Sequence, residues 1–132
     1  MEIVDRIKGI LTKDSDVTFA YLYGSFAWGI THKASDIDIA VYLKEGNMKF
    51  YLKKDNELLS NTALVSSKID LRILNVMPLV LKFKVVSEGR LLFSKDEQKR
   101  VDFETEVYNR YFELKPFLDE EKRLISEKIK AY

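Results

Sequence analysis

The stretch GSFAWGITHKASDIDIAV, residues 24–41, joins a glycine–serine turn to two aspartates that are one residue apart. Its last part, DIDIAV, alternates polar and apolar residues with the period of a β-strand. Side chains two positions apart on a strand point to the same face, so Asp36 and Asp38 are predicted to stand side by side. A strand that only had to pack would carry valine or isoleucine at these two positions. The two carboxylates therefore indicate a functional site on this strand.

A third aspartate lies on another predicted strand, KIDLRIL, residues 68–74. Asp70 has the opposite parity to the isoleucines and leucine of that strand. If the two strands are neighbours, Asp70 joins Asp36 and Asp38 on one side of the sheet. Three ionised carboxylates repel one another and need a counter-charge. The chain has no cysteine and no histidine accompanies the aspartates, so the ligands are all oxygen, which suits Mg²⁺ or Mn²⁺ and disfavours zinc.

The glycine–serine turn directly follows a predicted strand, and the residues after it are predicted to begin a helix. A strand-to-helix turn with glycine lets a phosphate approach the backbone, where the first amides of the helix point at it. Gly24 and Ser25 are therefore candidate phosphate-binding residues, with Ser25 adding a hydroxyl donor. The G-K-[ST] ending of a Walker loop is absent.

Each feature alone has a simpler explanation. Two solvated aspartates on an open sheet face give the same D-x-D pattern, and many glycine–serine pairs are plain turns. Together they place a phosphate cradle at the end of one strand and a carboxylate pair on the next. That combination is what a site for a divalent metal ion and a nucleotide requires.

Composition limits the remaining function classes. The chain has 132 residues, 46% hydrophobic and 33% charged, with a net charge of +1. We expect one domain over residues 1–132. We expect no direct binding to nucleic acid, because the chain lacks a large excess of basic residues. No stretch approaches the roughly 20 apolar residues of a membrane span, and the charged N-terminus is unlike a signal peptide. A cytoplasmic location is therefore expected.

Helical and strand patterns alternate along the chain, which predicts an α/β (α+β) domain with a small mixed sheet flanked by helices. A helix is predicted to begin at a Ser94 cap, with Glu97 completing a capping box. Pro116 is expected to interrupt it, so that C-terminal helices cover the chain from about residue 95 onward. The other predicted elements are helices over residues 1–12, 48–64 and 78–89 and strands over residues 17–23, 36–43, 68–74 and 90–93.

These motifs resemble the DNA polymerase β-type nucleotidyltransferase superfamily. GSFAWG, SDIDIAV and KIDLRIL match its G-S-x-A-x-G motif, its D-x-D pair and its later third aspartate, in that order. Because the chain is short, it resembles the minimal nucleotidyltransferases that are encoded beside HEPN-domain proteins. The resemblance implies an antitoxin of a HEPN/MNT toxin–antitoxin pair, which transfers AMP from ATP to a tyrosine of the HEPN ribonuclease toxin and forms a hetero-oligomer with it.

The resemblance also implies a role for each matching residue. Gly24 and Ser25 would hold the triphosphate, and Asp36, Asp38 and Asp70 would bind two Mg²⁺ ions. Asp70 would also accept the proton of the attacking hydroxyl. One position departs from the pattern, because Trp28 stands where the family often has an arginine that contacts phosphate. Lys33, in the loop before the aspartates, is a candidate to replace that charge.

Two other functions remain open at this point. The chain could neutralise its toxin by direct binding, with weak or no catalysis, and Trp28 is the feature that favours this. It could also be a nucleotidyltransferase for a small molecule, although it lacks a substrate domain. The pattern does not determine the preferred nucleotide, the number of AMP units or the acceptor tyrosine.

Overall fold

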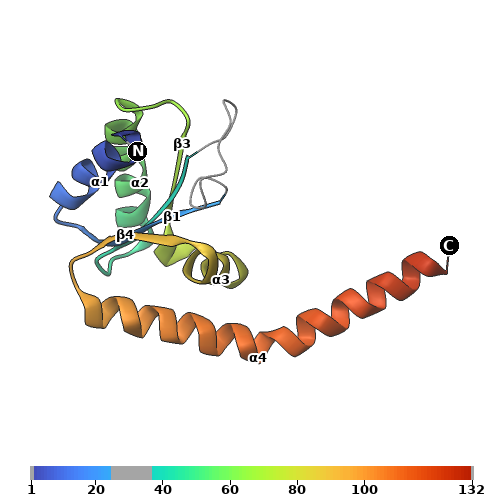
Figure 1. The fold of residues 1–132 in the computed structure, drawn as a ribbon. Coiled ribbons are helices and arrows are strands. Elements are labelled where there is room, and N and C mark those ends of the chain that lie inside the picture. The colour runs from blue at the N-terminus through green and yellow to red at the C-terminus, as the bar shows by residue number, and fades with distance from the viewer. Residues whose placement is uncertain (1, 25–36, 132) are drawn as a thin grey trace.

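A computed structural model describes residues 2–24 and 37–131 of the chain (Figure 1). Within these residues four α-helices and one short 3-10 helix accompany four strands, which confirms the predicted α/β class. The helices are α1 (Glu2–Lys13), α2 (Met48–Ala63), η2 (Leu74–Val76), α3 (Leu79–Glu88) and α4 (Glu97–Lys130), and the strands are β1 (Val17–Tyr23), β2 (Ile37–Leu43), β3 (Ile69–Ile73) and β4 (Arg90–Ser94).

The four strands form one mixed sheet in the order β3-β2-β1-β4. Strand β1 lies antiparallel to both β2 and β4, whereas β2 and β3 are parallel. The parallel pair needs a crossover, and α2 supplies it by packing against β3. The predicted edge strand at residues 90–93 is confirmed as β4, and β3 forms the other edge of the sheet among the residues described.

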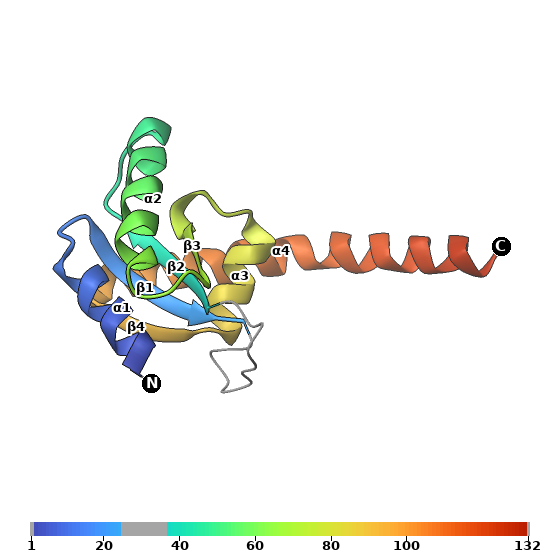
Figure 2. The same ribbon diagram turned by 90° about the horizontal axis from the view of Figure 1, so that it is seen from above.

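Helices cover both faces of the sheet (Figure 2). On one face, α1 and α2 pack against the apolar side of β2 and β3, in a core that includes Ile7, Leu58 and Ile39. On the other face, α3 and the first part of α4 cover a second core around Phe19 and Val85. The period of two in β2 therefore separates Ile37 and Ile39 from Asp38, as the sequence predicts.

The start of α4 differs from the prediction. Ser94 is the last residue of β4, and the helix is capped by Asp96, whose Oδ1 accepts a hydrogen bond of 3.0 Å from the backbone N–H of Lys99. The predicted capping box at Ser94 is wrong, because pairing with β1 carries the strand through that residue. Aspartate is as effective an N-cap as serine, so either residue satisfies the sequence signal.

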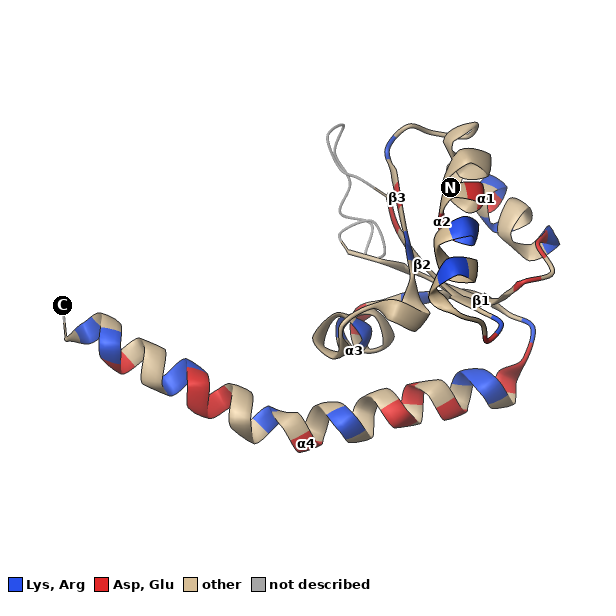
Figure 3. Ribbon diagram, turned by 180° about the vertical axis from the view of Figure 1, so that it is seen from behind, with Lys and Arg blue, Asp and Glu red and all other residues tan. Residues whose placement is uncertain are grey.

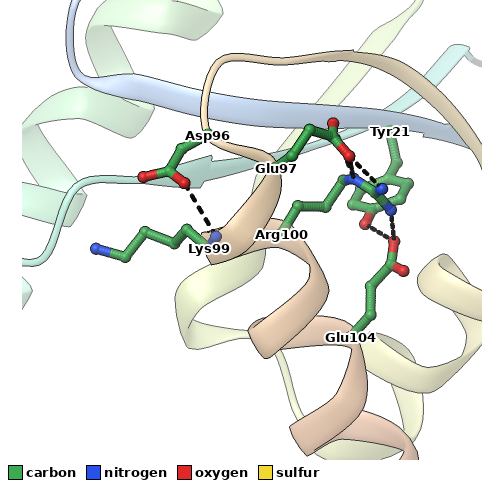
Figure 4. A network of polar contacts seen from close by, with 6 residues as sticks. All are labelled: Tyr21, Asp96, Glu97, Lys99, Arg100 and Glu104. Carbon is green, nitrogen blue, oxygen red and sulfur yellow. Dashed lines mark hydrogen bonds and ion pairs between the residues drawn. The ribbon is translucent and has the colours of Figure 1, made fainter.

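A polar network fastens the first turns of α4 to the sheet (Figure 4). The Tyr21 hydroxyl, on β1, donates a hydrogen bond to Glu104. Arg100 bridges Glu104, with an Nη1–Oε1 distance of 3.0 Å, and Glu97. Burial, and then the bond to Glu104, raise the pKa of Tyr21, so its hydroxyl stays protonated as a donor. The network thus fixes α4 over the face of the sheet that carries Asp38.

The predicted break at Pro116 is wrong, since α4 runs through it to Lys130. A proline inside a helix removes one backbone hydrogen bond and bends the helix, but it does not have to end it. Figure 1 shows that α4 changes direction part-way along its length. The Lys115–Asp119 ion pair, at 2.7 Å, joins two turns across the proline.

The C-terminal part of α4 extends away from the sheet (Figures 1 and 2). Lysine, arginine, aspartate and glutamate are mixed along its length (Figure 3), and pairs such as Arg123–Glu127 join successive turns. Ile125 and Ile129 are exposed and so do not belong to either apolar core. Among the described residues, no helix is both long and apolar enough to cross a membrane.

Lys54 is buried on α2 and is only 4% exposed. Its ammonium group lies 2.6 Å from Asp14 and 3.3 Å from Asp16. Burial alone would raise the pKa of Asp14, but the hydrogen bond from Lys54 and the other favourable contacts lower it on balance. The ion pair therefore holds α2 against the turn between α1 and β1.

Replacing Lys54 by methionine is expected to lower the free energy of unfolding by about 2–3 kcal/mol at pH 7, because Asp14 loses its counter-charge in a partly buried site. Since the pKa of Asp14 is lowered by folding, the contribution is complete above about pH 5 and is lost as the pH falls through the folded-state pKa. Urea unfolding at pH 7 and at about pH 2 tests both points. Lys53→Met, at an exposed neighbour, is the control and should change stability by less than about 0.5 kcal/mol. Equal losses in the two variants, or a Lys54 effect that persists in acid, would contradict the assignment.

Candidate active site

Two of the three predicted carboxylates lie side by side. Strands β2 and β3 are parallel neighbours, and their register pairs Asp38 directly with Asp70. Both side chains project from the face of the sheet opposite to Ile39 and Leu71. We call Asp38 and Asp70 the carboxylate site. It contains only oxygen ligands, which fits a hard divalent cation such as Mg²⁺.

Gly24 lies against this site. Its φ of 71° is in the left-handed region, which suits a residue without a side chain. A Cβ atom built on Gly24 would clash with Oδ2 of Asp38 and would lie 3.4 Å from its Cγ. The left-handed turn at the end of β1 therefore favours glycine, and any side chain at this position would also displace the Asp38 carboxylate.

Arg72 also faces the site, although the sequence motifs assign it no role. It follows Asp70 by two residues on β3, so its side chain emerges on the same face. Its Nε lies 3.5 Å from Oδ2 of Asp70, and both side chains are about half exposed. The same period of two that pairs the aspartates would have identified Arg72. Its charge offsets part of the repulsion between Asp38 and Asp70.

Tyr23 completes the surroundings of the carboxylate site. Its register partner across β1 and β2 is Asp38. The pKa of Tyr23 is raised to about 12, mainly by burial. The positive charge of Arg72 lowers this pKa, whereas the negative charges of Asp38 and Asp70 raise it further. The Tyr23 hydroxyl therefore remains protonated at neutral pH.

Several predicted residues fall outside the part of the chain that the structure describes: Ser25, Trp28, Lys33 and Asp36. Within residues 2–24 and 37–131, no group of three or more acidic, histidine or cysteine side chains is close enough together to hold a metal ion. The structure therefore joins Asp38, Asp70 and Gly24, and the third carboxylate of the predicted cluster stays a prediction.

Comparison with known protein families agrees with this arrangement. Residues 5–98 match the family model described as polymerase beta, nucleotidyltransferase, and this match covers most of the chain, including both aspartates and Gly24. The chain belongs to the polymerase beta nucleotidyltransferase family. The predicted superfamily and fold are thereby confirmed. A search of curated proteins finds no match.

Several solved structures similar to this nucleotidyltransferase come from toxin–antitoxin complexes. One is a chain from a toxin–antitoxin crystallised with AMP-PNP, with a TM-score of 0.68 and 27% identity, covering 98% of this chain and 99% of that one. Another is from a mutant of the MntA–HpeT toxin–antitoxin, with a TM-score of 0.69 and 26% identity over 96% and 98% of the two chains. A third is from the complex of a tri-AMPylated Shewanella oneidensis HEPN toxin with its MNT antitoxin, with a TM-score of 0.61 and 23% identity over 96% and 98%, and it shows the shared fold.

Proposed function

We propose that this nucleotidyltransferase is the antitoxin of a HEPN/MNT pair and transfers AMP from ATP to a tyrosine of a partner HEPN ribonuclease. The observation that carries the proposal is the direct register pairing of Asp38 with Asp70 beside the left-handed turn at Gly24. The similarity over nearly the whole chain to a protein from a toxin–antitoxin complex with AMP-PNP, an analogue of ATP, supports both the nucleotide and the partner. A cytoplasmic location remains a prediction.

Each residue has a role in the proposed reaction. Gly24 and Ser25 would hold the triphosphate. Asp36, Asp38 and Asp70 would hold two divalent cations, which are Mg²⁺ or, in place of Mg²⁺, Mn²⁺. When bound, the cations supply positive charge that neutralises the carboxylates and the phosphates. The tyrosine oxygen of the acceptor forms a bond to the α-phosphorus of ATP, the bond to the bridging oxygen breaks, and pyrophosphate leaves. Asp70 takes the proton of the tyrosine hydroxyl.

Arg72 gives the site a positive charge that does not depend on a metal. It lies on the same face as Asp70, and its side chain is half exposed, so it can turn toward a phosphate that enters the site. Guanidinium groups bind phosphate oxygens through paired hydrogen bonds. Arg72 is therefore a second candidate, besides Lys33, to supply the charge that Trp28 lacks.

One experiment tests the proposal. The purified chain is mixed with the HEPN-domain protein encoded beside its gene, ATP and Mg²⁺, and the partner is examined by intact-mass spectrometry and peptide mapping. The expected result is a gain of one or more AMP units on a tyrosine of the partner, dependent on both ATP and the metal. An unmodified partner, under conditions in which nucleotide binding to the chain is demonstrated, would remove the transferase assignment.

The second candidate is an antitoxin that acts by binding alone. Exposed apolar side chains on the extended part of α4, such as Ile125 and Ile129, favour it because they offer a surface for a partner. In that case the same mixture yields a stable complex, visible by size-exclusion chromatography, and no change in mass. A small-molecule acceptor has no such support among the described residues.

A further inference from the structure

Among residues 2–24 and 37–131, one side of the β3 backbone has no neighbouring strand. The N–H of Ile37 donates a hydrogen bond of 2.8 Å to the carbonyl of Lys68, and the register pairs Ile37 with Ile69. Backbone groups of successive strand residues point to opposite sides, so those of Asp70 and Arg72 face β2. The N–H and C=O groups of residues 69, 71 and 73 face outward. In the part of the chain that the structure describes, no strand pairs with that side.

An apolar groove of about 260 Å³ follows this open edge. Figure 2 shows β3 between α2 and α3, and both helices contribute walls to the groove. Leu52 and Val76 are 59% and 45% exposed, so the groove presents large apolar side chains to solvent beside the sheet edge. We call this the edge groove; its lining includes Met48 and Leu52 from α2, Leu71 and Ile73 from β3, Val76 from η2 and Leu81 from α3.

The edge groove has features that are not needed to protect an open sheet edge from pairing with other strands. Proteins guard open edges with short strands and charged side chains, and β3, with five residues and Arg72, has both. Exposed apolar walls work against that protection, because they attract the strands that the edge should repel. An edge of unpaired backbone groups beside apolar pockets is, however, the arrangement by which proteins bind extended peptides.

The edge groove is continuous with the carboxylate site. Asp70 belongs to β3 itself, and Arg72 contacts Asp70 while also lining the groove. Asp55, on the α2 wall, has its pKa raised first by burial and then by the negative charge of Asp70. The electrostatic field of the site thus reaches into the groove. The opposite edge strand, β4, lies two strands away from β2, which carries Asp38, and it shares no residue with the carboxylate site.

We propose that the edge groove binds an extended, tyrosine-containing segment of the acceptor protein as an additional strand on β3. This inference rests on the proposed function, and it identifies where the acceptor binds. Side chains directly opposite on neighbouring strands lie about 5 Å apart. A tyrosine opposite Asp70 would project from the same face as Asp70 and Asp38, with its hydroxyl beside the group that takes its proton.

Two matched variants on α2 test the walls of the groove. Leu52→Glu places a charge in the groove, whereas Leu59→Glu places the same charge seven residues along the same face of α2, outside the groove lining; Leu59 is 42% exposed. With the HEPN-domain partner as acceptor, we expect Leu52→Glu to lower kcat/KM for AMP transfer about tenfold or more, through KM, and Leu59→Glu to leave it unchanged. The affinity for AMP-PNP should be the same in all three proteins.

Hydrogen exchange followed by NMR tests the backbone contacts without requiring catalysis. The amides of Leu71 and Ile73 should exchange more slowly when the partner is added, whereas those of Asp70 and Arg72, already bonded to β2, should change little. Protection without AMP transfer would uphold the groove and end the proposed reaction. AMP transfer that is equal in both variants, with unchanged exchange at Leu71, would overturn the groove and leave the reaction standing. Protection that grows with concentration in the chain alone would assign the edge to a second copy, and it would also overturn the proposal.

Discussion

Replacing Asp38 by asparagine is expected to lower AMP transfer about 10³-fold or more, because the variant keeps the shape of the side chain but loses one of the paired negative charges. Asp38 lies opposite Asp70 on the neighbouring strand, so the two carboxylates of the carboxylate site stand on the same face of the sheet. The measurement is the single-turnover rate of label transfer from ATP to the HEPN-domain partner. Asp70→Asn should give a loss of similar size.

The stability of the Asp38→Asn variant separates catalysis from folding. Asp38 is half-buried and lies outside both apolar cores, so the free energy of unfolding without metal should change little. The parent protein should gain thermal stability from Mg²⁺ with AMP-PNP, and the variant should lose that gain. A variant that transfers AMP at the parental rate would show that Asp38 is not part of the catalytic machinery.

Replacing Gly24 by alanine is expected to lower AMP transfer about 100-fold, although the change adds a single methyl group. The new Cβ would occupy the position of the Asp38 carboxylate, so that carboxylate would have to leave its position in the site. The left-handed backbone at Gly24 adds about 1–2 kcal/mol of strain to the folded state. Urea unfolding and the single-turnover rate, measured on the same sample, report the two effects separately.

Gly9→Ala is the matched control for that experiment. Gly9 lies in α1, and a Cβ there meets nothing within 4 Å. Alanine is the better helix former, so this variant should be more stable by about 0.5–1 kcal/mol and fully active. If Gly24→Ala also kept its activity while losing stability, the close approach to Asp38 would have no catalytic role, and the glycine would serve the turn alone.

Local patterns in the sequence were sufficient to predict most of the elements. The period of two in residues 37–43 predicts which side chains of β2 enter the core, and the described strand agrees. The helix signals at Pro78 and around Ser94 were correct to within two or three residues. The predicted break at Pro116 is wrong, although proline by itself favours the end of a helix. Ion pairs between successive turns also support the continued helix, one across the proline and one after it.

The chemistry of the site was predicted in the same way, from order and spacing. The turn at Gly24, the aspartate at position 38 and the aspartate at position 70 match one family pattern, and the family model covers all three. The sequence patterns do not identify Arg72, because a single arginine on a strand is usually a solvated residue. Its role depends on the side chain that it contacts. Its contact with Asp70 gives it a place in the site.

The sequence by itself determined the parity of each strand, the acidic and glycine residues and the family, because these depend on neighbours in the chain. Only the tertiary structure decided that β3 lies beside β2 in the register that joins Asp38 to Asp70, that β3 is an edge of the sheet within the described residues, and that Lys54 is buried between acidic groups. The reason is physical: alternation and turn preferences act over a few residues, whereas the choice of a strand's neighbour depends on how α2 packs as the crossover between β2 and β3.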